Sequence, residues 1–366
     1  MEKNKLYTSQ IGKIIFILLI SSNIVYIPAK IFRQDAWLGI LLSSLMGFYI
    51  LYVFIKTQLL FPEKPIAIVA SDLLGKIPGH ILNGFFLFII FSILIGYGID
   101  VSIVLTTINP RYSPVLLNSV IYASCGFVVY HGINSVARLS NVIVWFVIIF
   151  LIFGFLLPLT QADFSQLTPL LAEWRPLIFQ SIFVSSWPFS EIVIIGAFLF
   201  LSSDLKQNKR VVYYWYSAAV LSLIAFTILS LVILGPELTL LYNFPTQEVL
   251  HLNDLGAFSR LDIFFTSFWV SASFVAIICY YQSFTMFIQQ LFSLKSNRGL
   301  IIPAGLMAFA SGLSVDISNL AYFDWFLHYL PLVNFFIIFT YVSALLTAVQ
   351  LYSAGKLKTR PGSDSA

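Results

Sequence analysis

The chain contains ten long apolar runs, which are separated by polar segments. Because the hydrocarbon core of a bilayer requires about 20 largely apolar residues per helix, each run predicts one membrane-spanning helix. The separating segments carry the Pro, Gly, Asn and charged residues typical of turns, as in FPEKP, NPRYSP and SLKSNRG. The predicted spans lie near residues 11–32, 37–59, 80–107, 114–131, 139–159, 177–201, 211–235, 260–291, 299–315 and 330–353.

This pattern predicts an all-α, polytopic protein. We expect a single integral membrane domain over residues 1–366, with spans one to five at about 11–159 and spans six to ten at about 177–353. Residues 354–366 form a short polar tail. The composition agrees, because 59% of the residues are hydrophobic and only 10% are charged, which would leave a soluble protein with too much exposed apolar surface. Membrane lipid therefore surrounds the predicted spans.

The distribution of Lys and Arg predicts the orientation in the membrane, since basic residues near span ends are retained on the cytoplasmic side. With ten spans, both termini share one side. Of the 20 Lys and Arg residues, all but five fall on that side, the exceptions being Lys30, Arg33, Arg111, Arg175 and Arg260. We therefore expect both termini, and the tail at 354–366, in the cytoplasm. The net charge of +4 reflects this sorting and gives no reason to expect nucleic-acid binding.

Motifs of soluble enzymes are missing from the sequence. It contains no P-loop, dinucleotide-binding glycine run, nucleophile elbow or HExxH pattern, and its four histidines fall at span ends or in loops. The two cysteines, Cys125 and Cys279, lie in different apolar runs, which favours packing over a disulfide or a metal site. We expect neither a cofactor, a metal nor an enzymatic activity.

Two of the predicted spans are interrupted by polar residues and proline. A single interruption is explained by a kink, but these two fall in span one and span six, the first spans of the two halves. Interrupted helices in corresponding positions indicate an inverted-repeat transporter fold with a ligand near the bilayer midplane. Unwound backbone is tolerated in a membrane where it lines a cavity or is buried in protein. The interruptions are Ser21, Ser22, Asn23 and Pro28 in span one, and Ser185, Ser186, Trp187 and Pro188 in span six.

Two carboxylates fall inside the predicted spans, and each has two interpretations. If Pro188 opens the second half of span six, Glu191 lies in its first turn, where the positive end of the helix dipole stabilises a carboxylate. An ionisable group near mid-membrane is also a functional-site hypothesis in its own right. Asp100, in span three, lies nearer the outer end, so it either faces Arg111 or water at the interface or contributes to the cavity.

Four motifs, in this order along the chain, carry a family resemblance: HGINSVARLSNVI, LLPLTQADFSQLTPLL, SSWPFSE and FSRLDIFFTSFW. Together they resemble the endospore germination permease family, the B subunits of nutrient germinant receptors, which are relatives of the amino acid–polyamine–organocation transporters. The resemblance covers about Lys5 to Tyr352. It implies a LeuT-like fold of five plus five inverted helices, and a small nutrient ligand, an amino acid or a sugar. It also implies the spore inner membrane as location, with a receptor A subunit and a C lipoprotein as partners.

The sequence departs from the family pattern at three places. Asn134 and Ser259 stand where many relatives have an acid, and the break in span one lacks glycine. Glycine lets a ligand approach the backbone closely, whereas Ser21, Ser22 and Asn23 would crowd the position where many relatives hold an α-carboxylate. This last departure bears most on the choice of ligand.

These observations predict a nutrient-sensing membrane subunit with its ligand between spans one, three, six and eight. An ion- or proton-coupled solute transporter is the alternative, with Glu191 or Asp100 as the proton site, because one fold hosts both functions. A channel is a third interpretation, for which the sequence offers no ring of charges. The candidate ligand-binding residues are Ser21, Ser22, Asn23, Ile24, Ser185, Ser186, Trp187, Phe189 and Glu191, and, chosen by depth, Tyr97, Asp100 and Ser271.

Overall fold

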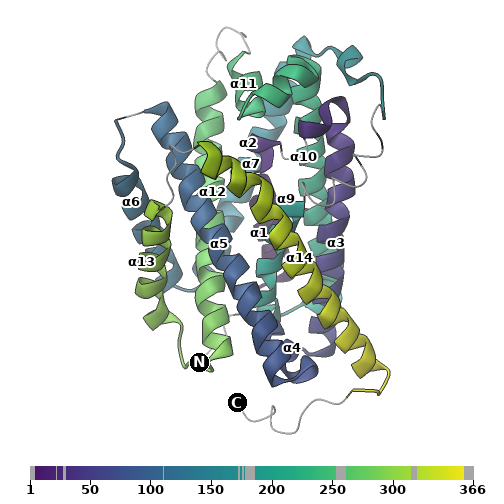
Figure 1. The fold of residues 1–366 in the computed structure, drawn as a ribbon, viewed down its shortest axis with the longest axis vertical. Helices are drawn as coiled ribbons and strands as arrows, with labels where there is room; N and C mark the ends of the chain where they lie inside the picture. The colour runs from purple at the N-terminus through teal and green to yellow at the C-terminus, as the bar shows by residue number, and fades with distance from the viewer. Residues whose placement is uncertain are drawn as a thin grey trace.

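The computed structural model describes residues 5–21, 23–27, 30–109, 111–171, 174, 177, 186–252, 261–314 and 320–357. Within these residues the chain is helical, and its one β-type pairing is an isolated bridge between Leu6 and Ser202. The helices form an elongated bundle with both chain ends at the same end (Figure 1). The all-α expectation is confirmed.

Helices occupy the positions of the predicted spans. Within the described residues, six helices are long and apolar enough to cross a membrane, and four shorter apolar helices, among them residues Pro188–Ala197, account for the remaining spans. In chain order they are α1 (Thr8–Ser21) with α2 (Asn23–Tyr26), α3 (Ala36–Leu60), α5 (Lys76–Ile108), α6 (Pro114–Tyr130), α7 (Ile133–Leu156), α9 (Ser186–Ser190) with the 3₁₀ segments η4 (Glu191–Ala197) and η5 (Leu199–Leu201), α10 (Leu205–Leu241), α12 (Leu261–Leu291), α13 (Arg298–Ser314) and α14 (Leu320–Ser353).

Several short helices at the two ends of the bundle were not predicted. α4 (Ile66–Leu74) lies near the chain ends, and α11 (Pro245–His251) lies at the opposite end (Figure 1). Pro65 precedes α4 and Gly75 ends it at a φ of 97°, which favours glycine. The other short segments are 3₁₀ turns: η1 (Lys30–Asp35), η2 (Pro158–Gln161) and η3 (Phe164–Leu167). Each is shorter than a span, so a search for long apolar runs passes over them.

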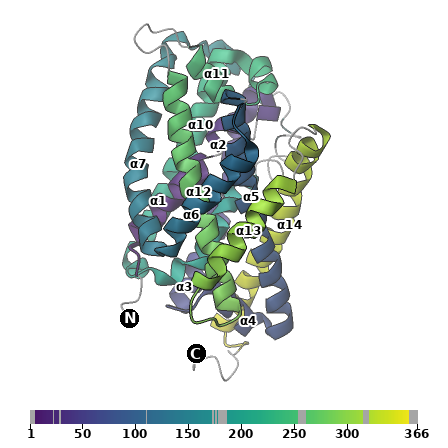
Figure 2. The ribbon, with the colours of Figure 1, turned by 90° about the vertical axis from the view of Figure 1, so that its left-hand side faces the viewer.

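Helix α1 lies in the interior of the bundle, where it contacts α7, α10 and α12 (Figures 1 and 2). Its residues from Ile14 to Ser21 are all buried. A helix that is apolar on every side is typical of such a central position. By contrast, α7 runs along one edge of the bundle in Figure 2 and exposes a row of large apolar side chains. The first span, with its polar residues Ser21 and Asn23, is therefore surrounded by protein.

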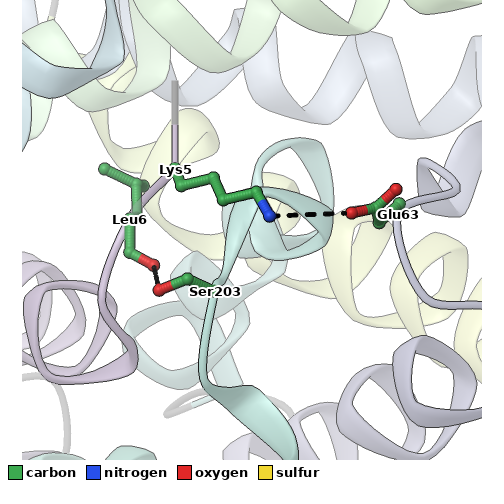
Figure 3. A network of polar contacts seen from close by, with 4 residues as sticks. All are labelled: Lys5, Leu6, Glu63 and Ser203. Atoms are coloured by element: carbon green, nitrogen blue, oxygen red, sulfur yellow. Dashed lines mark hydrogen bonds and ion pairs between the residues drawn. The ribbon is translucent and has the colours of Figure 1, made fainter. Parts of the chain in front are cut away.

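The N-terminal segment is fixed to the end of span six. The backbone N–H of Leu6 donates to the carbonyl of Leu201 (3.0 Å), and the N–H and Oγ of Ser203 donate to the carbonyl of Leu6 (2.9 and 3.1 Å). Figure 3 shows the Ser203 side-chain contact beside an ion pair of Lys5 with Glu63 at 3.8 Å. That pair is exposed, so it contributes little to stability; the backbone pairing carries the connection.

Asp204 completes this connection, which we call the N-terminal clamp (residues 5–8 with 201–204). Its Oδ1 accepts hydrogen bonds from the backbone N–H and the hydroxyl of Thr8, both at 2.7 Å, and its Oδ2 accepts one from Asn208 at 2.7 Å. Burial raises the pKa of Asp204, but the hydrogen bonds from Thr8 and Asn208 outweigh burial and hold that pKa below its usual range. The clamp thus joins the start of α1 to the start of α10.

Candidate functional site

The predicted interruption of the first span falls where α1 is followed by α2. Helix α1 ends at Ser21, α2 begins at Asn23, and Ser22 lies outside the described residues. The Ser21 hydroxyl donates to the carbonyl of Leu18 (2.7 Å), and the Asn23 side-chain amide donates to the carbonyl of Leu19 (2.8 Å). Both side chains donate to carbonyls three or four residues earlier in the chain, as Ser and Asn side chains in helices do. The two polar side chains of the first span therefore have hydrogen-bond partners inside the bundle.

In the described part of span six, the winding changes from the α-helix α9 to the 3₁₀ segment η4. Pro188 is the third residue of α9 and not its first, so Glu191 follows this five-residue helix as the first residue of the 3₁₀ segment η4. A proline fits within a first turn because the first N–H groups of a helix have no intrahelical acceptor. Glu191 thus lies three residues after Pro188 and in the first turn of η4. A first-turn position suits a carboxylate, so both interpretations of Glu191 stay open.

Glu191 is fully buried and accepts hydrogen bonds from two other spans. The Tyr97 hydroxyl of α5 donates to Glu191 Oε2 at 2.7 Å, and Ser21 Oγ of α1 lies 2.8 Å from the same hydroxyl. The Tyr280 hydroxyl of α12 donates to the backbone carbonyl of Glu191 at 3.1 Å. The Tyr97 and Tyr280 rings lie 5.6 Å apart. We call Ser21, Tyr97, Glu191 and Tyr280 the Glu191 network; it joins spans one, three, six and eight.

A second polar contact lies one helical turn further along α5. Asp100 is half-buried, and the Tyr26 hydroxyl of α2 donates to its Oδ1 at 3.3 Å. The Tyr26 ring meets the Phe244 ring edge-on at 5.4 Å. Among the described residues no Lys or Arg forms an ion pair with Asp100, so the expected alternative of a contact with Arg111 is not what the structure shows. Tyr97 and Asp100 share one face of α5. This face lies along the first span, because Tyr97 contacts Ser21 and Asp100 contacts Tyr26.

The remaining candidates lie apart from this network or outside the described residues. Phe189 is buried against Tyr216 of α10, with ring centroids 6.2 Å apart, and so packs between helices. Ile24 is buried, and its carbonyl accepts a hydrogen bond from Thr246 at 2.6 Å. Ser271 donates to the carbonyl of Ser267 in its own helix. Ser185 lies outside the described residues, and for Ser186 and Trp187 the structure describes the backbone of α9 alone.

Two tyrosines of the site, Tyr26 and Tyr280, were missed in the sequence analysis. The chain has 18 tyrosines, and most positions in an apolar run are consistent with a ring that simply packs. A buried tyrosine usually finds a hydrogen-bond partner, but the sequence does not say which one. The described residues contain no group of three or more His, Cys, Asp or Glu side chains that could hold a metal. The chemistry of this site is that of a carboxylate and hydroxyl groups, which bind amines and hydroxyls.

The fold and the site define a polytopic membrane protein of the LeuT-like class, in which spans one, three, six and eight share the Glu191 network. The chain is similar to a solved structure described as the crystal structure of MhsT in complex with L-phenylalanine, with a TM-score of 0.62 over 96% of this chain and 99% of that one. Only 13% of residues are identical, so this likeness shows the fold. The LeuT-like expectation is confirmed.

Sequence comparisons then give the family. The family profile described as spore germination protein matches residues 5–319, and the chain belongs to this family. It is also similar to spore germination protein KB of Bacillus subtilis (strain 168), with 24% identity over 317 residues that cover 84% of each chain. These findings confirm the resemblance to the endospore germination permeases.

Proposed function

We propose that this protein is the nutrient-sensing membrane subunit of a spore germination receptor. It binds a small nutrient, an amino acid or a sugar, between the interrupted spans one and six. Membership of the spore germination family supports a role in germination. The shared fold with MhsT, whose structure was solved with L-phenylalanine, supports a small-molecule site on this scaffold. The proposal includes a receptor A subunit and a C lipoprotein as partners, the spore inner membrane as location, and cytoplasmic termini.

The Glu191 network is the observation that carries this proposal. Glu191 is buried at the start of the second interrupted segment, and the Tyr97 hydroxyl that donates to it also meets Ser21 at the end of α1. An ammonium or hydroxyl group of a ligand offers Glu191 the same kind of hydrogen bond as Tyr97 does. A ligand that takes this place therefore releases Tyr97 from Glu191 and loosens the connection between spans one and six.

Such an exchange couples ligand binding to a conformational change. A ligand shifts a conformational equilibrium only by its difference in affinity for the two states. Here the two states differ in the Tyr97–Glu191 hydrogen bond, which belongs to the network shared by four spans. The nearby Asp100 adds a second carboxylate on the same face of α5, with Tyr26 as its hydrogen-bond partner and no paired Lys or Arg among the described residues. Two carboxylates at this place favour nutrients that carry an amine or several hydroxyl groups over anionic ones.

The test compares spores that carry Tyr97→Phe or Tyr122→Phe at matched protein levels. Tyr122 is a suitable control because it is also buried, and its hydroxyl donates to the carbonyl of Leu94, outside the network. We expect Tyr97→Phe to shift the nutrient dose response of germination and Tyr122→Phe to leave it near wild type. Equal responses in both variants would contradict the proposal. If Tyr97→Phe takes up labelled nutrient into proteoliposomes at the wild-type rate and germination of the Tyr97→Phe spores is unaffected, the result would indicate the transporter alternative.

A further inference from the structure

Lys13 occupies an unusual position for a charged residue. It lies in α1, about 8 Å along the axis from Thr8 at a rise of about 1.5 Å per residue, and next to the fully buried Ile14. Its Nζ lies 5.4 Å from the ring centroid of Trp145 in α7 and 5.9 Å from that of Trp215 in α10. The same Nζ donates a hydrogen bond to Asn141 Oδ1. A cation between two indole rings is favoured electrostatically.

The surroundings of Lys13 hold this arrangement in place. A Cβ atom on Gly12 would come within 2.5 Å of Trp215 Cδ1, so glycine at this position lets the indole lie against α1. Phe16, one turn further along α1, meets Trp215 edge-on with centroids 5.6 Å apart. Trp215 is thus fixed between two turns of α1, with Lys13 over its ring. Three helices build the site, and Trp145 leaves it open on one side because 54% of its surface is exposed.

The described residues supply no acidic partner for the positive charge at this site. Among the described residues no carboxylate pairs with Lys13 or with Arg138. Arg138 is exposed and lies one turn before Asn141 on α7, so Arg138, Asn141 and Trp145 share one face of that helix. An anion placed beside Lys13 and Arg138 would complete the hydrogen bonds of both cations.

The adjacent surface is apolar. Along α7, beyond Trp145, the side chains of Phe146, Ile149, Ile152 and Phe153 are about half exposed. A headgroup beside Lys13 would therefore continue into a surface suited to an acyl chain. Tryptophan is typical of the membrane–water interface, where its ring lies at the level of the headgroups. Charge, depth and the apolar surface all fit one occupant.

We propose that Lys13 and Arg138 bind the phosphate of an anionic phospholipid, with Trp145 and Trp215 beside the headgroup and the acyl chain along α7. Basic pockets between membrane helices recognise anionic headgroups in this way. The site lies at the end of the bundle that holds the N-terminal clamp, and it contacts α1, the interrupted helix of the Glu191 network. Bound lipid therefore stabilises the packing of α1 between α7 and α10.

Thermal unfolding of the purified protein in a neutral detergent tests this site. The probes are phosphatidylglycerol, phosphatidylcholine with the same acyl chains, and inorganic phosphate. We expect phosphatidylglycerol to raise the melting temperature, and the other two to have little effect. Lys13→Gln should weaken the apparent affinity for phosphatidylglycerol about five-fold, the factor that corresponds to about 1 kcal/mol per basic residue. Arg138→Gln should weaken it similarly, and Lys13→Arg should largely retain it.

Lys56→Gln is the matched control. Lys56 also lies over one aromatic ring, that of Tyr52 at 5.5 Å, but away from α7. The Lys56→Gln variant should bind phosphatidylglycerol as the wild type does. Equal stabilisation by both lipids, or unchanged affinity in Lys13→Gln and Arg138→Gln, would overturn the proposal, and equal stabilisation by inorganic phosphate would indicate a free anion instead. If Lys13→Gln does not fold, Arg138→Gln still tests the proposal, because Arg138 is exposed. None of these outcomes depends on nutrient binding.

Discussion

Replacing Tyr97 with phenylalanine tests how Glu191 is held. The change deletes one hydroxyl, which donates to Glu191 Oε2 at 2.7 Å and lies 2.8 Å from Ser21 Oγ. The ring, and with it the packing against Tyr280, is kept. A hydrogen bond to a charged group contributes about 1.5–3 kcal/mol, whereas hydrogen bonds inside membrane proteins average about 0.6 kcal/mol. If Glu191 is an ionised carboxylate held by Tyr97, the first value applies.

The control is Tyr122→Phe, which deletes a buried hydroxyl that donates to the carbonyl of Leu94 at 3.3 Å. Its expected effect is about 0.6 kcal/mol. Reversible unfolding in mixed micelles measures both free energies, and we expect Tyr97→Phe to be destabilised by at least about 1 kcal/mol more than the control, from the two contributions above.

A double-mutant cycle assigns the effect to the pair. With Glu191→Gln as the second change, the coupling energy isolates the Tyr97–Glu191 contact if neither single variant forms new contacts. We expect a coupling of about 1–2 kcal/mol, within the usual range for residues in one hydrogen-bond network. Equal destabilisation of Tyr97→Phe and Tyr122→Phe, with a coupling near zero, would refute a carboxylate held by Tyr97.

Three further predictions follow from the structure. Germination of Glu191→Gln spores should respond to nutrient with a shifted dose dependence and Glu191→Ala spores should respond less, because glutamine keeps the hydrogen bonds; equal and complete loss of nutrient accumulation in both would instead indicate a proton-coupled transporter. Because the folded pKa of Asp204 is depressed, its stabilisation of the N-terminal clamp should be present above the unfolded pKa and lost as pH falls through the folded pKa; unfolding of Thr8→Val against pH should show a smaller acid dependence than the wild type. A cysteine at Gln207 should be labelled only from the cytoplasm and one at Gln166 only from outside, and swapped labelling would end the predicted topology.

Much of the fold could be predicted from the sequence, because bilayer thickness sets the length of an apolar run. Helices of the described residues occupy the ten predicted runs, whereas Ser22 and residues 178–185, where the interruptions are predicted, lie outside the described residues. The short helices α4 and α11 could not be found in this way, since they lie at the bundle ends and cross nothing. The 3₁₀ winding of η4 was also missed, because no residue in EIVIIGA distinguishes it from an α-helix.

The site was predicted less completely than the fold. Ser21 and Glu191 could be proposed because polar residues inside apolar runs are conspicuous, and Tyr97 because of its depth. Their contact could not be predicted, since it depends on how α1, α5 and η4 are placed in space. Tyr280 and Tyr26 gave no signal among the many aromatic residues. Phe189 was proposed from its position in the break, whereas the structure places its ring against Tyr216.

Ligand-induced stabilisation tests the central claim most directly. A ligand that binds the folded protein at 100 times its Kd adds about 2.7 kcal/mol to the free energy of unfolding. We predict that a panel of amino acids and sugars contains a compound that raises the melting temperature of the wild type and of Tyr122→Phe, and that Glu191→Ala loses this rise. A panel without any stabilising compound, or one whose active compound stabilises Glu191→Ala equally, would contradict a nutrient site at the Glu191 network.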